Sequence, residues 1–164
     1  MPKSDQPLRE VYVQPGESHL VTGPAILRTL LGSCVGIAFL APRLGAAALC
    51  HPMLPVCPSN LIGRASIAAS RRYVDFAIRD LANQFDALGA RRSEVRVKLF
   101  GGAGVLPAVS AASRPTVGRL NCESALRELR SHGFEVAAQS LGGTSGMNIQ
   151  FNTETGEVLL KRLG

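Results

Sequence analysis

The segment GSCVGIAFLAPRLGAAALCHP, residues 32–52, holds two short apolar runs on either side of a Pro-Arg-Leu-Gly turn. The first run covers 35–40 and the second covers 45–51, with Arg43 and Leu44 near the turn. Both runs are apolar at consecutive positions, which is typical of strands that are covered on two faces. We therefore expect an antiparallel hairpin of two buried strands, with Cys34 before the first strand and His51 at the end of the second.

Further strands and two helices are expected around this hairpin. Apolar residues recur at helical spacing from Val74 to Leu88 and stop at Gly89, which predicts the best helix. A second helix is expected to begin at Asn121 as its cap and to end at Gly133. Strands are expected at 11–13, 25–31, 95–99, 134–138, 148–151 and 157–161. This order predicts an α/β fold, a single-domain layered sandwich in which helices pack on a mixed β-sheet.

Length and composition indicate one soluble domain. A chain of 164 residues with 46% hydrophobic and 18% charged residues can bury one ordinary core. Residues 1–9 are expected to be a loose leader before a domain at 10–164. No stretch has the pattern of a signal peptide or a membrane span, so we expect no membrane insertion and a cytoplasmic location.

Cysteine usage and net charge indicate the cellular compartment and the kind of partner. Four cysteines in a chain without a secretion signal are interpreted as free thiols in a reducing compartment. The formal net charge of +6 favours acidic partners. Because the basic residues are scattered and only 5% of residues are aromatic, nucleic acid is not expected as a partner.

The break between the strands at 25–31 and 35–40 can present a nucleophile. Gly32 and Ser33 precede Cys34, where the chain can expose a side chain at a sheet edge and direct backbone N–H groups at a carbonyl. The hairpin would return His51 close to Cys34, and an imidazole next to a thiol is the minimum equipment for acyl transfer. On an amide, this pair would form a thioester, release ammonia and leave a carboxylate, without a metal or cofactor.

Two alternatives compete with that interpretation. A free cysteine is often a small buried hydrophobe, and a histidine at a strand end is often structural. A zinc site of Cys34, Cys50, Cys57 and His51 is the other chemical option, but the sequence has no C-x-x-C pair. Moreover, adjacent residues Cys50 and His51 would point to opposite faces of a strand.

Several motifs resemble those of the CheD family. They occur in the same order as in that family and span nearly the whole chain from about residue 10. Leu-Leu-Gly-Ser-Cys-Val at 30–35 is followed seventeen residues after the cysteine by His-Pro-Met-Leu-Pro at 51–55. The motifs further along are Tyr-Val-Asp at 73–75, Lys-Leu-Phe-Gly-Gly-Ala at 98–103, Val-Gly-Arg-Leu-Asn at 117–121, Gly-Gly at 142–143 and Thr-Gly-Glu-Val at 155–158.

The resemblance implies a cysteine-dependent protein-glutamine glutaminase, which converts glutamines of methyl-accepting chemotaxis proteins to glutamates. It implies a catalytic set of Cys34, His51 and a threonine, which falls on Thr29. Gly101 and Gly102 do not fit a phosphate-binding loop and are expected to shape the rim of the active site, together with Gly32 and Ser33. A CheC-type phosphatase is implied as a further partner.

The sequence departs from the family pattern at two places. Gly146 is followed by Met147, where an arginine is usual, and a lost arginine could weaken a substrate or partner contact. The stretch rich in alanine and arginine from Arg64 to Arg72 also differs.

Two other functions use the same residues or the same fold. A non-catalytic adaptor would bind the receptor or the phosphatase without deamidating, although the presence of Cys34 and His51 argues against it. A transglutaminase or cysteine protease would use the same thioester chemistry on another substrate.

Overall fold

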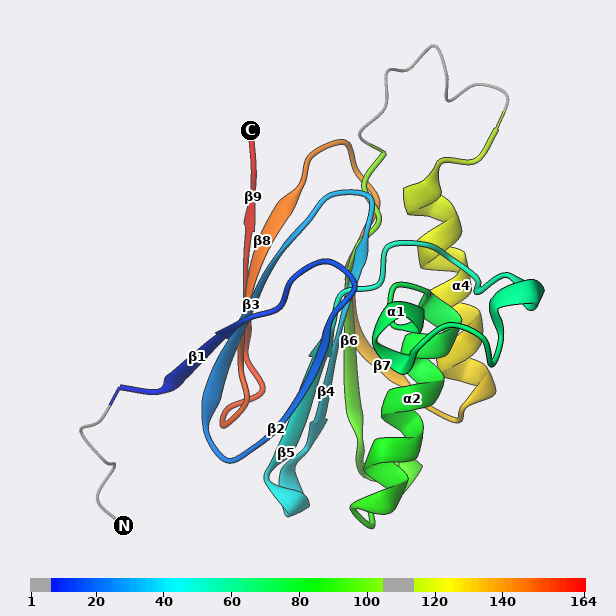
Figure 1. Cartoon of the computed structure of the whole chain (residues 1–164). Helices are drawn as coiled ribbons and strands as arrows, with labels where there is room; N and C mark the ends of the chain where they lie inside the picture. The colour runs from blue at the N-terminus through cyan, green and yellow to red at the C-terminus, as the bar shows by residue number, and fades with distance from the viewer. Residues whose placement is uncertain (1–6, 105–113) are drawn as a thin grey trace.

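The chain folds into three layers (Figure 1). The computed structural model describes residues 7–104 and 114–164. A four-stranded sheet forms one outer layer, a five-stranded sheet forms the middle layer, and the helices cover the far face of the middle sheet. The predicted α/β layered sandwich is thereby confirmed, with its strands divided between two sheets.

The five-stranded sheet carries the predicted hairpin at its centre. Its strand order is β2-β5-β4-β6-β7, with bounds β2 (Ser18–Thr22), β5 (Ala46–Cys50), β4 (Val35–Ala41), β6 (Arg96–Gly101) and β7 (Val136–Leu141). The antiparallel pair β4 and β5 is joined by a 3-10 turn, η1 (Pro42–Leu44), and Gly45 at φ 58° closes it. Every residue of β4 and β5 is buried, as expected for strands covered on both faces.

The four-stranded sheet packs on one face of this hairpin. Its order is β1-β3-β8-β9, with bounds β1 (Arg9–Tyr12), β3 (Ala25–Leu31), β8 (Met147–Asn152) and β9 (Val158–Arg162). Alternate residues of β3 and β8, such as Leu27, Leu31 and Phe151, meet Leu49 of β5 in a core between the two sheets. Arg9, the last residue of the expected leader, begins β1, and residues 1–6 lie outside the described part of the chain.

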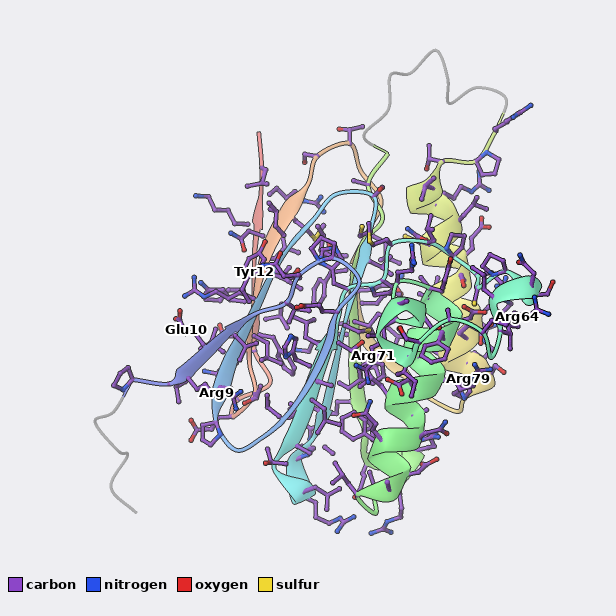
Figure 2. All side chains as sticks on the ribbon, in the orientation of Figure 1. Arg9, Glu10, Tyr12, Arg64, Arg71 and Arg79 are labelled. Carbon is purple, nitrogen blue, oxygen red and sulfur yellow. The ribbon has the colours of Figure 1, made fainter. Side chains whose placement is uncertain are left out.

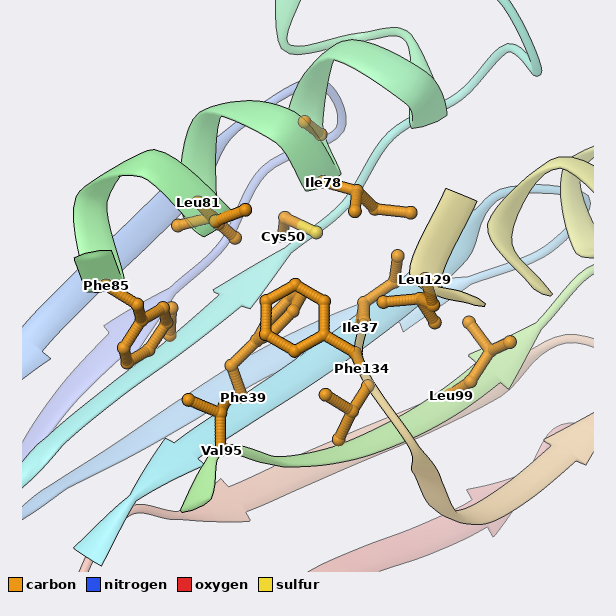
Figure 3. Close-up of a cluster of buried hydrophobic side chains, with 14 of the residues drawn as sticks. Ile37, Phe39, Cys50, Ile78, Leu81, Phe85, Val95, Leu99, Leu129 and Phe134 are labelled. Atoms are coloured by element: carbon orange, nitrogen blue, oxygen red, sulfur yellow. The ribbon is translucent and has the colours of Figure 1, made fainter. Parts of the chain in front are cut away.

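The helices cover the other face of the hairpin. They are α1 (Ile67–Ser70), α2 (Val74–Ala87) and α4 (Val117–Ser131), with 3-10 turns η2 (Ser59–Leu61) and η3 (Arg92–Glu94). In the core below them, Phe39 of β4 contacts the rings of Phe85 and Phe134 at centroid distances of 6.0 and 5.4 Å (Figure 3). Burial of Phe85 with Ile78 and Leu81 contributes to the packing of α2 on the sheet.

The observed element bounds differ from the sequence predictions, most clearly at the second helix. The second helix begins at Val117 after the cap Thr116, whose side chain accepts a hydrogen bond from Arg119 N, so the predicted cap at Asn121 is wrong. Asn121 instead lies one turn inside the helix and is fully buried. Strand β2 was not predicted, and the strand expected at 134–138 begins two residues later, at Val136.

Basic side chains occur on more than one side of the molecule. Figure 2 shows Arg9 on β1 and Arg64, Arg71 and Arg79 on the helical side. Arg71 is paired with Asp80 at 3.0 Å, which neutralises part of this charge locally. None of the helices in the described ranges is long and apolar enough to cross a membrane.

Candidate active site

A buried threonine and a buried histidine form the centre of the candidate site. The Oγ1 atom of Thr29 lies 2.6 Å from Nδ1 of His51, and the two residues are 0% and 2% exposed. Thr29 belongs to β3 of the four-stranded sheet, whereas His51 directly follows β5 of the five-stranded sheet. This hydrogen bond therefore joins the two sheets.

The alternation of side chains along the strands explains why these residues meet. In β5, Ala48 and Cys50 face the helices, and Leu49 faces the other sheet, so His51 also points between the sheets. In β3, Leu27 and Leu31 point into the core between the sheets, and Thr29 shares their parity.

Cys34 directly precedes β4, and the backbone next to it is bonded to the segment that follows His51. The backbone N–H of Val35 donates to the carbonyl of Pro52 at 3.3 Å, which holds the residue after Cys34 against the residue after His51. Cys34 is partly buried and packs against the core between the sheets. The structure thus brings Cys34, His51 and Thr29 to one end of the space between the sheets.

The hydrogen bonds of Thr29 indicate which nitrogen of His51 carries the proton. Thr29 Oγ1 lies 2.7 Å from the carbonyl oxygen of Val13, which can only accept. Because a hydroxyl has a single proton, Thr29 donates to Val13 and accepts from Nδ1–H of His51. The Nε2 atom of His51 is then unprotonated and can act as a base.

Burial sets the protonation states of the thiol and the imidazole. Desolvation lowers the pKa of His51 to about 4, and the Val13 backbone opposes that shift. Desolvation raises the pKa of the Cys34 thiol, partly offset by its own backbone N–H. Both directions favour a neutral thiol next to a neutral imidazole over an ion pair in the free protein.

Two glycines hold the turn that precedes Cys34. Gly102 N donates to the carbonyl of Cys34 at 2.8 Å, and Ala103 N donates to the carbonyl of Gly32 at 3.0 Å. Gly101 and Gly102 have φ values of 103° and 69°, and a Cβ atom at Gly101 would lie 2.3 Å from the carbonyl oxygen of Cys34. Only glycine fits at that distance, so these residues shape the turn that precedes Cys34.

Two N–H groups of this turn have no acceptor among the described residues. Within residues 7–104 and 114–164, the N–H groups of Ser33 and Cys34 donate to no other backbone or side-chain group. Two neighbouring free donors beside a nucleophile are the usual elements of an oxyanion hole.

An open apolar cavity of about 360 Å³ lies against Cys34. Its lining includes Ser33, Cys34, Met53, Leu54, Ala103 and Val117. Another cavity, of about 330 Å³, lies between the sheets and is lined by Leu40, Arg96, Lys98 and Phe151 among others. Cys34 lines the first cavity and does not line this one.

The residues of the alternative zinc site do not converge. Cys50 lies in the core below the helices, where burial raises its pKa to about 12, on the face of the sheet opposite to His51 (Figure 3). In the described ranges, no three histidine, cysteine, aspartate or glutamate side chains come together as a metal site.

The two departures from the family pattern have structural explanations. Met147 is 0% exposed and fills the core between the sheets, so its side chain does not reach the surface around the site. In the stretch from Arg64 to Arg72, Ser66 caps α1, and the Arg72 carbonyl accepts hydrogen bonds from Met53 N and Leu54 N. That stretch supports the backbone that follows His51.

Sequence reasoning missed two buried polar residues of α4 near the site. Asn121 Nδ2 donates to the carbonyls of Ser33 and Met53 at 3.0 and 2.9 Å, and Ser124 Oγ donates to the carbonyl of Pro55 at 2.6 Å. Both lie at inward positions of the helix with Ala125 and Leu129. A polar residue on an otherwise apolar helix face was the signal that could have found them.

Comparison with known proteins identifies the family. A family model described as CheD chemotactic sensory transduction matches residues 53–162. The chain is 42% identical over 156 residues to the probable chemoreceptor glutamine deamidase CheD 2 of Geobacter sulfurreducens, covering 95% of this chain and 91% of that protein. It is 35% identical over 168 residues to the probable chemoreceptor glutamine deamidase CheD of Maridesulfovibrio salexigens, covering 99% and 97%.

Among solved structures, the chain is similar to YlmD from Geobacillus stearothermophilus, with a TM-score of 0.49 and 15% sequence identity. The match covers 76% of this chain and 50% of that one.

The fold and the site define a two-sheet α/β protein in which a buried threonine and histidine lie beside a partly buried cysteine. The chain belongs to the CheD family.

Proposed function

We propose that this protein is a cysteine-dependent protein-glutamine deamidase that acts on methyl-accepting chemotaxis proteins. Membership of the CheD family and the deamidase names of relatives at 42% and 35% identity support the reaction and the substrate. The hydrogen bond between Thr29 and His51 at 2.6 Å, beside Cys34, is the observation that carries the mechanism.

In the first half-reaction, Nε2 of His51 takes the proton of the Cys34 thiol as its sulfur attacks the side-chain carbonyl carbon of a substrate glutamine. The C–S bond forms, and the carbonyl oxygen becomes an oxyanion. The imidazolium then gives its proton to the amide nitrogen, the C–N bond breaks, and ammonia leaves. A thioester between Cys34 and the glutamyl group remains.

In the second half-reaction, water replaces ammonia. Nε2 of His51 takes a proton from water, whose oxygen attacks the thioester carbonyl. The C–S bond breaks, the proton returns to sulfur, and the glutamine has become a glutamate. Thr29 keeps Nδ1 protonated throughout, so that the same nitrogen, Nε2, faces the reacting atoms in both steps.

The backbone of the Gly32 to Cys34 turn stabilises the oxyanion in this mechanism. The N–H groups of Ser33 and Cys34, which donate to no other group among the described residues, are the proposed donors, and Gly101 and Gly102 keep the turn in place. Since the resting pair is neutral, the charge that develops on the oxyanion and the imidazole appears only in the transition state, where such donors act most strongly.

The surface around Cys34 suits a glutamine on the exposed face of a helix. Met53, Leu54 and Val117 are 39%, 40% and 39% exposed and border the cavity with apolar atoms. An open cavity accepts one protruding side chain and leaves the substrate backbone outside, whereas a protease would require a cleft that holds an extended strand. The protein would act in the cytoplasm, and a CheC-type phosphatase is a proposed partner.

The proposal is tested by incubating the cytoplasmic domain of a chemoreceptor with the wild-type protein or with Cys34→Ala and mapping the receptor peptides by mass spectrometry. Conversion of defined glutamines to glutamates by the wild type only is the expected result. Receptor binding without conversion by either protein would reject the deamidase in favour of the adaptor. Cleavage or cross-linking of the receptor would favour the protease or the transglutaminase.

A further inference from the structure

Asn121 is fully buried in α4 and bridges the two segments that carry the candidate nucleophile and base. One side-chain amide, Nδ2, donates to the carbonyl of Ser33 at 3.0 Å and to the carbonyl of Met53 at 2.9 Å. Ser33 directly precedes Cys34, and Met53 lies two residues after His51. Both protons of the amide nitrogen are therefore used to connect these segments.

The contact with Ser33 also sets the direction of a backbone donor. Ser33 C=O and Cys34 N–H belong to one peptide unit, which is trans, so they point in opposite directions. Because Asn121 fixes the carbonyl, it also fixes the N–H of Cys34, which donates to no other residue in the described part of the chain. The neighbouring carbonyls of Gly32 and Cys34 are held by Ala103 N and Gly102 N, so the whole turn has a single orientation.

The approach of α4 to this turn depends on a second glycine contact. A Cβ atom at Gly118 would lie 2.5 Å from the carbonyl oxygens of Gly102 and Ala103. Since Gly118 has no side chain, the first turn of α4 can pack directly on the Gly102 backbone and bring Asn121 within reach of Ser33.

One polar atom of the Asn121 side chain is left unpaired. Its Oδ1 atom is buried and has no hydrogen-bond partner among the described residues. A buried unpaired acceptor is unfavourable, so it offsets part of the stabilisation from the two hydrogen bonds of Nδ2. The surrounding inward positions of α4 hold residues such as Ala125 and Leu129.

We propose that Asn121 is a positioning residue for the reaction. It holds the Gly32 to Cys34 turn against the segment after His51, so that the thiol stays within reach of the imidazole and the N–H of Cys34 stays directed at the substrate oxyanion. The inference rests on the proposed deamidase function. Asn121 contacts no reacting atom and acts through the backbone of Ser33 and Met53.

The test measures how far Cys34 depends on His51. The rate of alkylation of Cys34 by iodoacetamide at pH 7, read by peptide mapping, is compared between each protein and the same protein with His51→Ala. In the wild-type background, His51→Ala slows alkylation, because the imidazole no longer assists removal of the thiol proton. The Asn121→Leu variant keeps the volume of the side chain but has no hydrogen-bond donor. The Asn121→Ser variant is a smaller change that folds more readily, and its short side chain reaches fewer of the two carbonyls.

In both Asn121 variants we expect the effect of His51→Ala on alkylation to fall towards none, because misplaced groups no longer act as a unit. Deamidation should show a kcat lower by about 100-fold with little change in KM, the size of loss typical of a small misplacement. Ser124→Ala is the matched control. Ser124 is equally buried on the same helix but reaches only Pro55, so the coupling should persist.

An undiminished effect of His51→Ala in a folded Asn121→Ser or Asn121→Leu protein would overturn the inference, as would the absence of any effect in the wild-type background. Failure of the wild type to convert receptor glutamines would instead reject the proposed function, because alkylation is read without the receptor. The two failures are therefore distinguishable.

Discussion

Thr29 and His51 are supplied by different β-sheets, and the hydroxyl of the first lies 2.6 Å from Nδ1 of the second. The contact is buried, and the hydroxyl also bonds the carbonyl of Val13 at 2.7 Å. Packing of the four-stranded sheet on the five-stranded sheet thus determines the tautomer of the proposed base.

Replacement of Thr29 by valine keeps the shape of the side chain and removes its hydroxyl. His51 Nδ1–H and the Val13 carbonyl then lose their partner in a buried place, which should lower the free energy of unfolding by about 1–3 kcal/mol. Because the imidazole loses its fixed tautomer, kcat for glutamine deamidation should fall by about 10- to 100-fold. Thr29→Ser, which keeps the hydroxyl, should retain most of the stability and most of the kcat. Equal losses of stability and kcat in the two variants would contradict the assigned role of the hydroxyl. Deamidation assays and urea denaturation give the two readouts.

His51 should make the protein less stable in acid. Its pKa is about 4 in the folded protein against 6.5 for the ordinary group, so the unfolded chain binds the proton more strongly. Folding stability is therefore lost as the pH falls from about 6.5 towards about 4, by roughly 2 kcal/mol between pH 7 and pH 5. Urea denaturation at both pH values should show a smaller loss for His51→Gln, and the same loss in both proteins would mean that His51 is not held neutral.

The neutral resting state of Cys34 and His51 predicts how the reactivity of Cys34 depends on pH. Burial raises the pKa of this thiol and lowers that of His51, so no thiolate-imidazolium pair forms in the free protein. Alkylation of Cys34 should therefore rise further with pH above neutrality, as free thiolate forms from the neutral thiol. An alkylation rate that reaches its maximum below neutrality and does not rise further at alkaline pH would indicate an ion pair instead.

Gly102 should be intolerant of any side chain. Alanine there would have φ near 69° and would place its Cβ 2.0 Å from Cys122 Sγ and 2.8 Å from the Gly118 carbonyl oxygen. Strain and overlap together should lower the free energy of unfolding by more than about 3 kcal/mol. Gly142→Ala is the matched control, since Gly142 has φ 80° with no atom within 4 Å of the added Cβ.

For this control we expect a loss of only about 1 kcal/mol, from φ strain alone. Thermal unfolding of the two variants separates the effects. Similar losses of stability in the two variants would show that the backbone of Gly102 is not packed tightly against α4.

Local features of the sequence were sufficient for the hairpin, with Cys34 directly before its first strand and His51 directly after its second. The runs at 35–40 and 45–51 are adjacent, and a short turn leaves one way to pair them, which the register Ile37 to Cys50 matches. Thr29 entered through resemblance to a family, because its contact with His51 depends on packing between two sheets. No local pattern contains that information.

The start of the second helix was predicted wrongly for a different reason. Asparagine is a good helix cap, and the pattern around Asn121 therefore favoured a start there, although Thr116 is also a capping residue. Tertiary contacts decided between them, since Asn121 finds the carbonyls of Ser33 and Met53 inside the protein. Those carbonyls belong to segments 88 and 68 residues away, beyond the reach of any local rule.

The most direct test of the central claim is to trap the thioester. A chemoreceptor cytoplasmic domain is incubated with the protein in the presence of hydroxylamine, and its peptides are mapped by mass spectrometry. Hydroxylamine competes with water for the thioester, so the wild type should yield glutamyl hydroxamate at the same glutamines that otherwise become glutamates. The Cys34→Ala protein should yield neither product while it keeps the wild-type fold by circular dichroism. Glutamate formed without hydroxamate, or conversion by Cys34→Ala, would contradict a mechanism in which Cys34 forms the thioester.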